Sequence, residues 1–393
     1  MGVPAGQGEP TGFRLIVFRL GVVHSRYASA SSGENIVVER ELAALRRRGV
    51  EVVAISANGG EIHGRQQFSA AFRVSTGRGK SPDLDGWGGP FDLLHVHNLF
   101  PSWSTNWLGK QSLPPLVQTV HNFRAVCAAA SLYRDGHKCM DCVTRSPVQG
   151  FRHACYRDSR LVTLPLTVNH LLQGGRRSLK LPDRLLFPSR AALELAFEAG
   201  VDVSQATVSP PFFAPGAPAA APRTGFVFVG RLSPEKGVLE LIHAWPSEYE
   251  LTLIGDGPLG AAVASAARGR REIKVVGHLE PAAVAEYVSG AEALVFPSLA
   301  METFGLVYGE ALAAGTPVIA RQGTVVAGLV ADEGTGAVYA DERSLPVCLA
   351  AVRNSQSQLS RSCRRVFEQQ YNEAAWWIRT RATYESLLGK PID

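Results

Sequence analysis

Short apolar runs alternate with amphipathic stretches along most of the chain. The apolar runs are typical of buried strands, and the stretches between them carry apolar residues at helical spacing, as in 35–48 before Gly49. This alternation is typical of βα units, which build parallel sheets covered by helices. We therefore predict an α/β protein with strands at 13–18, 50–55, 92–98, 116–120, 184–187, 206–209, 226–230, 251–254, 273–277, 293–296, 317–320 and 335–339.

The chain of 393 residues is long enough for two domains with separate cores. Segment 210–225 is rich in Pro and Ala, which predicts a linker with little packing. We therefore predict an N-terminal domain at 1–215, a C-terminal domain at 216–372 and a terminal helix within 373–393. Residues 58–90 are rich in Gly, Ser and Arg and are predicted as loops with one short strand.

The net charge of +5 permits weak attraction to anionic partners but does not indicate nucleic acid binding. The basic run 46–48 is better explained as a helix C-terminus. There is no apolar window of about 18 residues, so no membrane-spanning helix is predicted. Segment 1–12 lacks the charged and apolar regions of a signal peptide and is expected to be a disordered leader. Cytoplasm is the default location, and a peripheral membrane contact stays open.

Two glutamates flank a predicted helix N-terminus in the second half. Glu302 follows the apolar run 293–296 and is expected in a loop, whereas Glu310 is expected in the first turns of the next helix. The backbone N–H groups of 303–306 would then form a cradle for phosphate oxygens. Two carboxylates beside such a cradle suit a nucleotide-sugar, because a carboxylate accepts hydrogen bonds from two vicinal hydroxyls. The alternative is that both are ordinary solvated helix charges.

Two cations follow the predicted strand 226–230. Arg231 and Lys236 lie on a turn that enters a helix, so both charges and a helix N-terminus converge there. This combination suits a diphosphate, which Arg binds in a bidentate manner and Lys as a point charge. Segment 255–260 formally matches the dinucleotide fingerprint G-x-G-x-x-G. It lies in the second half of the chain and lacks a convincing acidic partner, so we favour a simple turn.

Polar residues follow two predicted strands of the first half. His97 and Asn98 end the strand 92–98, and His121 with Asn122 follows the strand 116–120. An open α/β sheet places its binding site at the carboxyl ends of its strands. These four side chains are therefore site candidates, although an isolated histidine is more often structural.

Four of the six cysteines lie close together in the sequence. Cys127, Cys139, Cys142 and Cys155 give C-x11-C-x2-C-x12-C, and the middle pair has the spacing of a zinc knuckle. A tetrahedral Zn²⁺ would tie together an insertion at about 123–175 that otherwise lacks a core. Buried thiols, or a labile disulfide that a reducing cytoplasm disfavours, are the alternatives.

A resemblance to a known family rests on several of these motifs. The run E-T-F-G-L-V-Y-G-E-A-L-A-A-G-T-P-V from Glu302 resembles the E-x7-E signature of the retaining glycosyltransferases of family four, and 230–237 is similar to their G-R-L-x-x-x-K-G. The H-N-F-R, R-D-G and cysteine motifs resemble a subset of that family. The resemblance implies the GT-B fold, in which the parallel sheets of two Rossmann-like domains face each other across a cleft. It also implies that helix 373–393 crosses back to the N-terminal domain.

The resemblance further implies transfer of a hexose from a nucleoside diphosphate sugar, UDP- or GDP-sugar foremost, with retention and without a catalytic cofactor. The implied catalytic residues are Arg231, Lys236, Glu302 and His121. Donor-binding residues would be Gly33, Gly230, Arg231, Lys236, Gly255, Gly277, His278, Glu302, Phe304, Gly305, Leu306 and Glu310. The acceptor site would use His97, Asn98 and Asn122. Structural zinc on the four cysteines is the metal that we expect.

Other readings stay open at this stage. The acceptor could be a glycan, a lipid-linked sugar or a small molecule, in polysaccharide, glycolipid or natural-product biosynthesis. The chain could act as a monomer or a homodimer. A nucleotide-sugar epimerase, a glycan phosphorylase and a non-catalytic nucleotide-sugar-binding or zinc scaffold protein are the competing functions.

Overall fold

The first strand lies later in the chain than the sequence predicts. The structure, a computed structural model, describes residues 18–27, 32–59, 64–216 and 222–392, so the expected leader and most of the expected strand 13–18 lie outside the described residues. Strand β1 is Arg19–Arg26, which was expected to be a loop. The prediction failed because β1 buries polar residues, His24 and Ser25, within an otherwise apolar strand.

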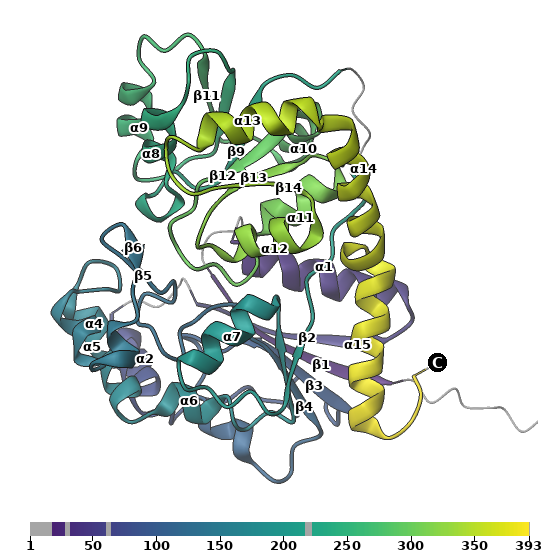
Figure 1. Cartoon of the computed structure of the whole chain (residues 1–393). Coiled ribbons are helices and arrows are strands. Elements are labelled where there is room, and N and C mark those ends of the chain that lie inside the picture. The colour runs from purple at the N-terminus through teal and green to yellow at the C-terminus, as the bar shows by residue number, and fades with distance from the viewer. Residues whose placement is uncertain (1–17, 28–31, 60–63, 217–221, 393) are drawn as a thin grey trace, which may run out of the picture.

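Six parallel strands form the N-terminal sheet, in the order β2-β1-β3-β4-β7-β8 (Figure 1). Both faces are covered by helices, which explains why central strands such as β3 are buried along their whole length. The strands are β1, β2 (Glu51–Asn58), β3 (Leu93–Asn98), β4 (Leu116–Thr119), β7 (Arg184–Phe187) and β8 (Ala206–Val208). The helices are α1 (Gly33–Arg47), α2 (Arg65–Thr76), α3 (Asp141–Thr144), α4 (Val148–Arg152), α5 (Arg160–Leu171), α6 (Gly174–Ser178) and α7 (Arg190–Glu198), with the hairpin β5 (Tyr133–Arg134) and β6 (His137–Lys138) before α3.

A second parallel sheet forms the C-terminal half, in the order β11-β10-β9-β12-β13-β14. Its strands are β9 (Phe226–Val229), β10 (Leu251–Ile254), β11 (Ile273–Gly277), β12 (Ala293–Phe296), β13 (Val318–Arg321) and β14 (Gly336–Tyr339). Its helices are α8 (Val238–Ala244), α9 (Gly260–Ala266), α10 (Pro281–Gly290), α11 (Leu306–Ala313), α12 (Val325–Glu333), α13 (Leu345–Asn354) and α14 (Gln356–Val366). The order reverses between β9 and β12, and a doubly wound sheet binds its ligand at such a reversal.

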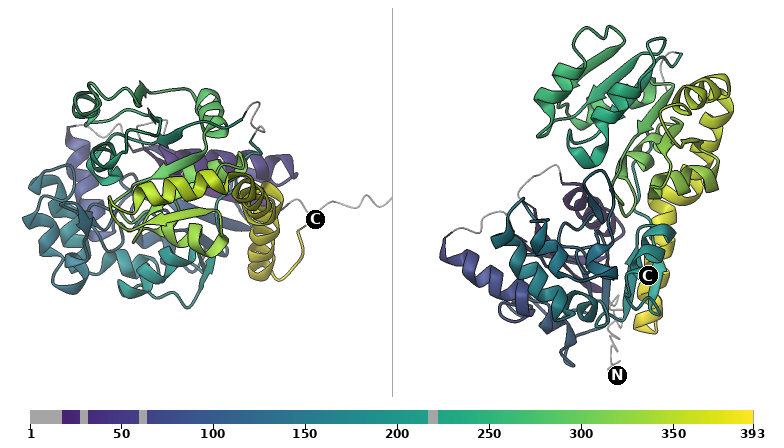
Figure 2. Two further views of the ribbon diagram at one scale, coloured as in Figure 1. Left: turned by 45° about the horizontal axis from the view of Figure 1, so that its top comes forward. Right: turned by 60° about the vertical axis from the view of Figure 1, so that its left-hand side comes forward.

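The terminal helix α15 (Glu373–Leu388) extends from the C-terminal half along the N-terminal sheet (Figures 1 and 2). Trp376 is buried against Phe212, with ring centroids 4.8 Å apart. The Tyr384 hydroxyl lies 2.8 Å from His95 Nδ1 in the core. The helix therefore packs its aromatic side chains into the N-terminal half.

Two predictions about the connecting segments were wrong. Residues 58–90 contain the helix α2, whose large apolar side chains Phe68 and Phe72 are exposed, so the segment lacks a buried apolar stripe. Segment 210–225 was expected to be a linker with little packing, but its residues Phe212 and Phe213 are both buried. Phe212 packs into the core of the N-terminal half and Phe213 into that of the C-terminal half. The surrounding Pro and Ala residues are typical of a linker, so the sequence did not predict this packing.

Candidate active site

The ion pair between Lys236 and Glu302 lies where the C-terminal sheet reverses its strand order. Lys236 ends a short turn after β9, and Glu302 lies in the loop after β12. Lys236 Nζ donates a hydrogen bond to Glu302 Oε1 at 2.6 Å, and Ser298 Oγ donates to the same oxygen at 3.0 Å. The two charged side chains are 28% and 22% exposed. Solvent and ligands can therefore reach both.

The turn that carries Lys236 depends on a close approach of two backbone segments. Gly237 has a φ of +66°, and a Cβ atom there would lie 2.2 Å from the carbonyl oxygen of Pro297. The carbonyl of Glu235 accepts a hydrogen bond from the N–H of Leu299 at 2.8 Å. The glycine thus brings the loop after β9 against the loop after β12, which sets the Lys236–Glu302 distance.

The loop and helix around the two glutamates have the expected form. Glu302 lies before α11, and Glu310 is within it, as predicted. Gly305 is the N-cap of α11, with a φ of +89°. Among the described residues, the N–H groups of 303–306 donate no hydrogen bond to any side chain or to any backbone carbonyl outside helices and strands. These groups are therefore available for an anionic ligand.

Glu310 contacts a residue from the other half of the chain. Arg40 Nη2, on α1, lies 3.1 Å from Glu310 Oε1, and both side chains are about a third exposed. The Arg40 guanidinium also lies over the Phe213 ring, 5.5 Å from its centroid. The sequence did not predict a role for Arg40, because its partner Glu310 is 270 positions away and no motif in α1 marks Arg40 as a site residue.

Three contacts bring the N-terminal half to the loop that carries Glu302. Thr303 Oγ1 donates to the carbonyl of His121 at 2.8 Å, and Ser189 Oγ donates to the carbonyl of Thr303 at 2.7 Å. A Cβ atom on Gly33, the first residue of α1, would lie 2.7 Å from Leu306 Cδ1 at the start of α11. The N-termini of α1 and α11 are therefore direct neighbours across the two halves.

Three of the predicted donor-site glycines join the ends of neighbouring strands. Gly255 donates its N–H to the carbonyl of Gly277 at 2.8 Å. A Cβ atom on Gly255 would lie 1.8 Å from the carbonyl oxygen of Gly230, so no other residue fits there. Arg231, next to Gly230, is exposed and forms no ion pair with any described residue. His278 follows Gly277 and is exposed.

The predicted histidines stack on one another, with His97 buried and His121 partly buried. His97 Nδ1 lies 2.9 Å from His121 Nε2, with the rings stacked at a centroid distance of 5.2 Å. The ring of His95 lies 4.2 Å from that of His97. The pKa of both His95 and His121 is lowered to about 3, mainly by burial, and for His121 the neighbouring imidazoles of His24 and His95 contribute to this shift. These rings are therefore neutral at physiological pH.

The histidine stack also approaches a buried carboxyl. Glu41, His95 and His97 each offer one ligand atom within 4.8 Å of the other two. Both nitrogens of His95 already bond to hydroxyls, those of Tyr384 and Thr119. We therefore interpret the group as a hydrogen-bonded core beneath His121 and not as a metal centre.

The two predicted acceptor-site asparagines differ in their surroundings. The Asn98 side chain is buried and donates to the carbonyls of Ser25 and Phe100. The Asn122 side chain donates to Glu34 Oε2 at 3.3 Å. Burial raises the pKa of Glu34 to about 8, although Arg124 opposes this shift. The Glu34 carboxyl, at the start of α1, was not expected, since a first-turn glutamate usually only complements the helix dipole.

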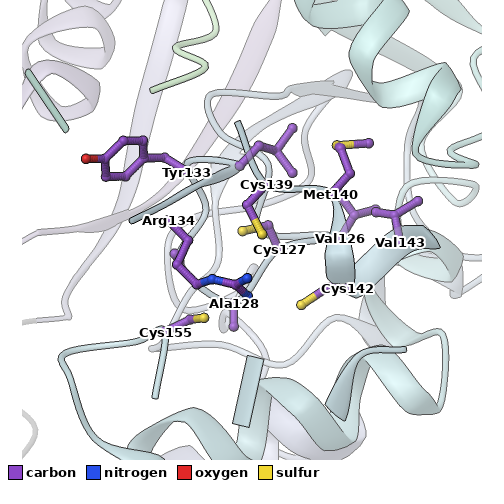
Figure 3. Close-up of a pocket in the computed structure, with 12 residues that line it drawn as sticks. Val126, Cys127, Ala128, Tyr133, Arg134, Cys139, Met140, Cys142, Val143 and Cys155 are labelled. Carbon is purple, nitrogen blue, oxygen red and sulfur yellow. The ribbon is translucent and has the colours of Figure 1, made fainter. Parts of the chain in front are cut away.

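The four cysteines of the predicted metal set line one pocket (Figure 3). All are free thiols. As the side chains stand, no three of these sulfur atoms lie within 4.8 Å of one another. The fold thus gathers Cys127, Cys139, Cys142 and Cys155 in one place, in an arrangement more open than a metal-bound one.

Solved structures show which class of protein this fold defines. The chain superposes on sucrose-phosphate synthase from Thermosynechococcus elongatus with a TM-score of 0.65 at 19% identity, covering 95% of this chain and 99% of the other. The HepE protein of Anabaena in complex with UDP-glucose gives a TM-score of 0.60 at 15% identity, with 94% and 99% covered. Two parallel Rossmann-like halves of this kind define the GT-B fold.

Both halves also match family models. Residues 32–212 match the glycosyl transferase 4-like domain, and 218–345 match glycosyl transferases group 1. A glycogen synthase of Mycobacterium tuberculosis is 30% identical over 184 residues, 43% of this chain and 44% of the relative. A phosphatidyl-myo-inositol mannosyltransferase of Mycobacterium leprae is 24% identical over 241 residues, 59% and 55%. The chain spans about half the length of the curated relatives it matches. It belongs with the glycosyltransferases of family-four type that have the GT-B fold.

Proposed function

We propose that the protein transfers a hexose from a UDP- or GDP-sugar to an acceptor hydroxyl, with retention at the anomeric carbon. The observation that carries this proposal is the accessible Lys236–Glu302 pair at the N-terminal side of α11, opposite His121. The solved HepE structures contain UDP and UDP-glucose, which supports a nucleotide-sugar as donor.

The charge that develops on the leaving diphosphate sets the main catalytic requirement. Arg231 and Lys236 would stabilise it together with the free N–H groups of Phe304, Gly305 and Leu306, so that no catalytic metal is required. Gly33 would let the start of α1 approach the same phosphates. Gly230, Gly255, Gly277 and His278 would hold the nucleotide at the ends of β9, β10 and β11.

The sugar and ribose hydroxyls would be bound by carboxylates and a neutral imidazole. Glu302 would accept hydrogen bonds from the donor sugar, and Glu310 from the ribose. In the proposed retaining step, the bond between the anomeric carbon and the leaving phosphate oxygen breaks while the acceptor oxygen bonds on the same face. The acceptor proton passes to that phosphate oxygen. His121, neutral because of its burial, would position the sugar near its reacting carbon.

The acceptor would enter from the N-terminal half. Asn122 and the Glu34 carboxyl beside it would contact the acceptor, while His97 and Asn98 are buried in the core. A glycan, a lipid-linked sugar or a small molecule would suit such a site. We expect the protein to act in the cytoplasm, as a monomer or a homodimer.

A peripheral membrane contact is supported by an exposed apolar surface on α2 and α5. These helices pack side by side, and Phe68, Phe72 and Leu161 are 80%, 56% and 82% exposed. Segment 145–190 carries nine Lys or Arg and two Asp, a charge balance that suits anionic lipid headgroups. Within the described residues, no helix is long and apolar enough to cross a membrane.

A binding and turnover assay tests the transferase proposal. The purified chain is heated with UDP, GDP, ADP and TDP and with their common sugars, and the melting temperature is recorded. A ligand that binds the folded state raises that temperature, so one nucleotide should stand out. Release of that nucleoside diphosphate from the matching sugar donor, with and without inorganic phosphate, then separates a transferase from a phosphorylase. If none of the ligands shifts the melting temperature, the proposal is wrong.

A further inference from the structure

Four cysteine side chains from separate segments line one pocket outside the proposed donor site. Cys139 follows the hairpin β5–β6, Cys142 lies in α3 and Cys155 follows α4. Cys127 lies in the turn after β4. Their side chains point into one pocket, which the side chain of Arg134 also lines (Figure 3). In chain order a hairpin leads into a C-x2-C pair, and two more thiols close the set.

These thiols are not accounted for as ordinary core residues. Cys127 is buried and the other three are half-buried, and all four are free thiols. Cysteine thiolates are common ligands of structural Zn²⁺, and four of them complete its tetrahedral coordination. Four free thiols that line one pocket therefore match the ligand set of a structural zinc site.

The segment around the cysteines also has little regular structure to hold it. Helices α3 and α4 have four and five residues, and β5 and β6 have two residues each. Six of the seven non-glycine residues with positive φ among the described residues lie here: Ala130, Leu132, Asp135, Ala154, Arg157 and Asp158. A left-handed backbone conformation is strained in a non-glycine residue, so such a segment persists only when the surrounding structure fixes it.

Metal binding requires the four sulfur atoms to move closer together than they stand here. A zinc–sulfur distance of about 2.3 Å in a tetrahedral site places the sulfur atoms roughly 3.8 Å apart. Zinc with four thiolates carries a net charge of about −2. The Arg134 side chain lines the same pocket, and its guanidinium also pairs with Asp135 at 3.3 Å and Asp141 at 2.8 Å, so it offsets only part of that charge.

The same segment contacts the loop that carries Glu302. The carbonyl of Ser131 accepts a hydrogen bond from the N–H of Met301 at 3.2 Å. Met301 packs against the cluster that contains Cys127 and Leu132. The cysteine segment is therefore placed to hold the residue next to Glu302.

We propose that Cys127, Cys139, Cys142 and Cys155 bind one structural Zn²⁺, and that the metal-bound segment supports the loop 298–305. Binding releases the four thiol protons to solvent and involves no change in redox state. The zinc site takes no part in the transfer reaction, so this inference stands apart from the proposed function.

Metal content of the freshly purified full-length chain is the first test. Elemental mass spectrometry should find about one zinc per chain, and the Cys142→Ser and Cys155→Ser variants should lose most of it. The matched control is Cys348→Ser, which changes a half-buried free thiol outside the pocket. If Cys142→Ser does not fold, chelation of the wild-type chain should instead expose four further thiols to a thiol reagent. A chain without zinc that gains no thermal stability when zinc is added would overturn the proposal, as would intact masses that show disulfides.

Hydrogen exchange tests the link to the donor loop. Amides of 298–305 should exchange at least several-fold faster in Cys142→Ser, or in the chelated wild-type chain, than in Cys348→Ser. The unchanged exchange of β12, which precedes the loop, serves as the internal control. Loss of zinc with no change in 298–305 would refute the supporting role and leave an isolated metal site.

Discussion

At the scale of single residues, the Lys236–Glu302 pair is better explained by ligand binding than by stability. Exposed ion pairs contribute about 0–1 kcal/mol to folding, and both of these side chains are about a quarter exposed. The pair nevertheless lies at the reversal of strand order, where Gly237 lets the loop that carries Lys236 pack against the loop that carries Glu302. A partly solvated cation there can exchange its carboxylate for a phosphate at little cost.

Substitution of the lysine should therefore separate catalysis from stability. We expect Lys236→Ala to lower turnover by roughly 10²–10³-fold, because an aimed charge at the leaving group is lost. Its free energy of unfolding should change by less than about 1 kcal/mol. Steady-state kinetics and urea unfolding measure the two effects, with Lys110→Ala, another exposed lysine, as control. Turnover near that of the control would remove Lys236 from the mechanism.

Substitutions of Arg40 and Glu310 should change the affinity for the nucleotide in opposite directions. The ribose hydroxyls would compete with Arg40 for the Glu310 carboxylate, so the ion pair opposes nucleotide binding by about 0.2–1 kcal/mol. Arg40→Ala should then tighten nucleotide binding by about 1.4- to 5-fold, whereas Glu310→Ala should weaken it. Calorimetric titration with the preferred nucleoside diphosphate measures both. Weaker binding in Arg40→Ala would show that the guanidinium itself contacts the nucleotide.

The buried imidazole of His95 predicts a loss of stability in acid. Its folded pKa, about 3, lies below the ordinary value of 6.5, so the unfolded chain binds an extra proton between these pH values. Stability is therefore fully present above pH 6.5 and falls as the pH drops toward 3, by about 2 kcal/mol at pH 5 from this group. Urea unfolding at pH 7 and pH 5 should show a smaller difference for His95→Gln than for His243→Gln, which changes an exposed histidine. Equal differences would contradict the assignment.

At the scale of elements, the sequence predicts what local pattern controls. The strands of the C-terminal sheet, the loop position of Glu302 and the helical position of Glu310 follow from apolar runs and turn residues. β1 was misplaced because its buried His24 and Ser25 interrupt the apolar pattern. α2 was missed because it buries almost no apolar side chain, and hydrophobic periodicity is the signal on which helix prediction depends.

The residues of the candidate site likewise fall into those that the sequence predicts and those that it does not. Residues within one motif, such as 302–306 or 231–236, could be named in advance because a short loop keeps them together. Arg40 and Ser189 could not, since their contacts with the second half exist only after both sheets have formed. The order of the histidine stack, with His97 behind His121, likewise depends on the pairing of β3 with β4.

The terminal helix offers a prediction with a control on the same element. Trp376 of α15 is 2% exposed and contacts Phe212, whereas Ile378 is 69% exposed. We expect Trp376→Ala to lower the free energy of unfolding by about 3–5 kcal/mol, because a large buried side chain leaves a cavity. Ile378→Ala should change it by no more than about 0.5 kcal/mol. Denaturant unfolding of both variants decides whether α15 is part of the N-terminal core.

At the scale of the whole molecule, the exposed apolar side chains of α2 and α5 lie on the same half as the basic segment 145–190. Phe68 on α2 and Leu161 on α5 are exposed, and the two helices pack side by side in the N-terminal half. Exposed aromatic and aliphatic side chains over basic residues are typical of proteins that bind at a membrane surface. Such a surface would hold the N-terminal half, where the acceptor is proposed to enter, close to a lipid-linked substrate.

Vesicle sedimentation tests this arrangement. The wild-type chain should bind vesicles that contain anionic phospholipid and dissociate as salt is raised, because the headgroup attraction is screened. Phe68→Ser with Leu161→Ser should reduce binding by roughly tenfold, since each change removes about 1.5–3 kcal/mol of apolar burial when the side chain is fully inserted. The control is Ile378→Ser, equally apolar and exposed but on α15. Equal binding of the control and the double variant would show that charge alone holds the protein. Absence of binding by the wild-type chain would leave a soluble acceptor as the substrate to look for.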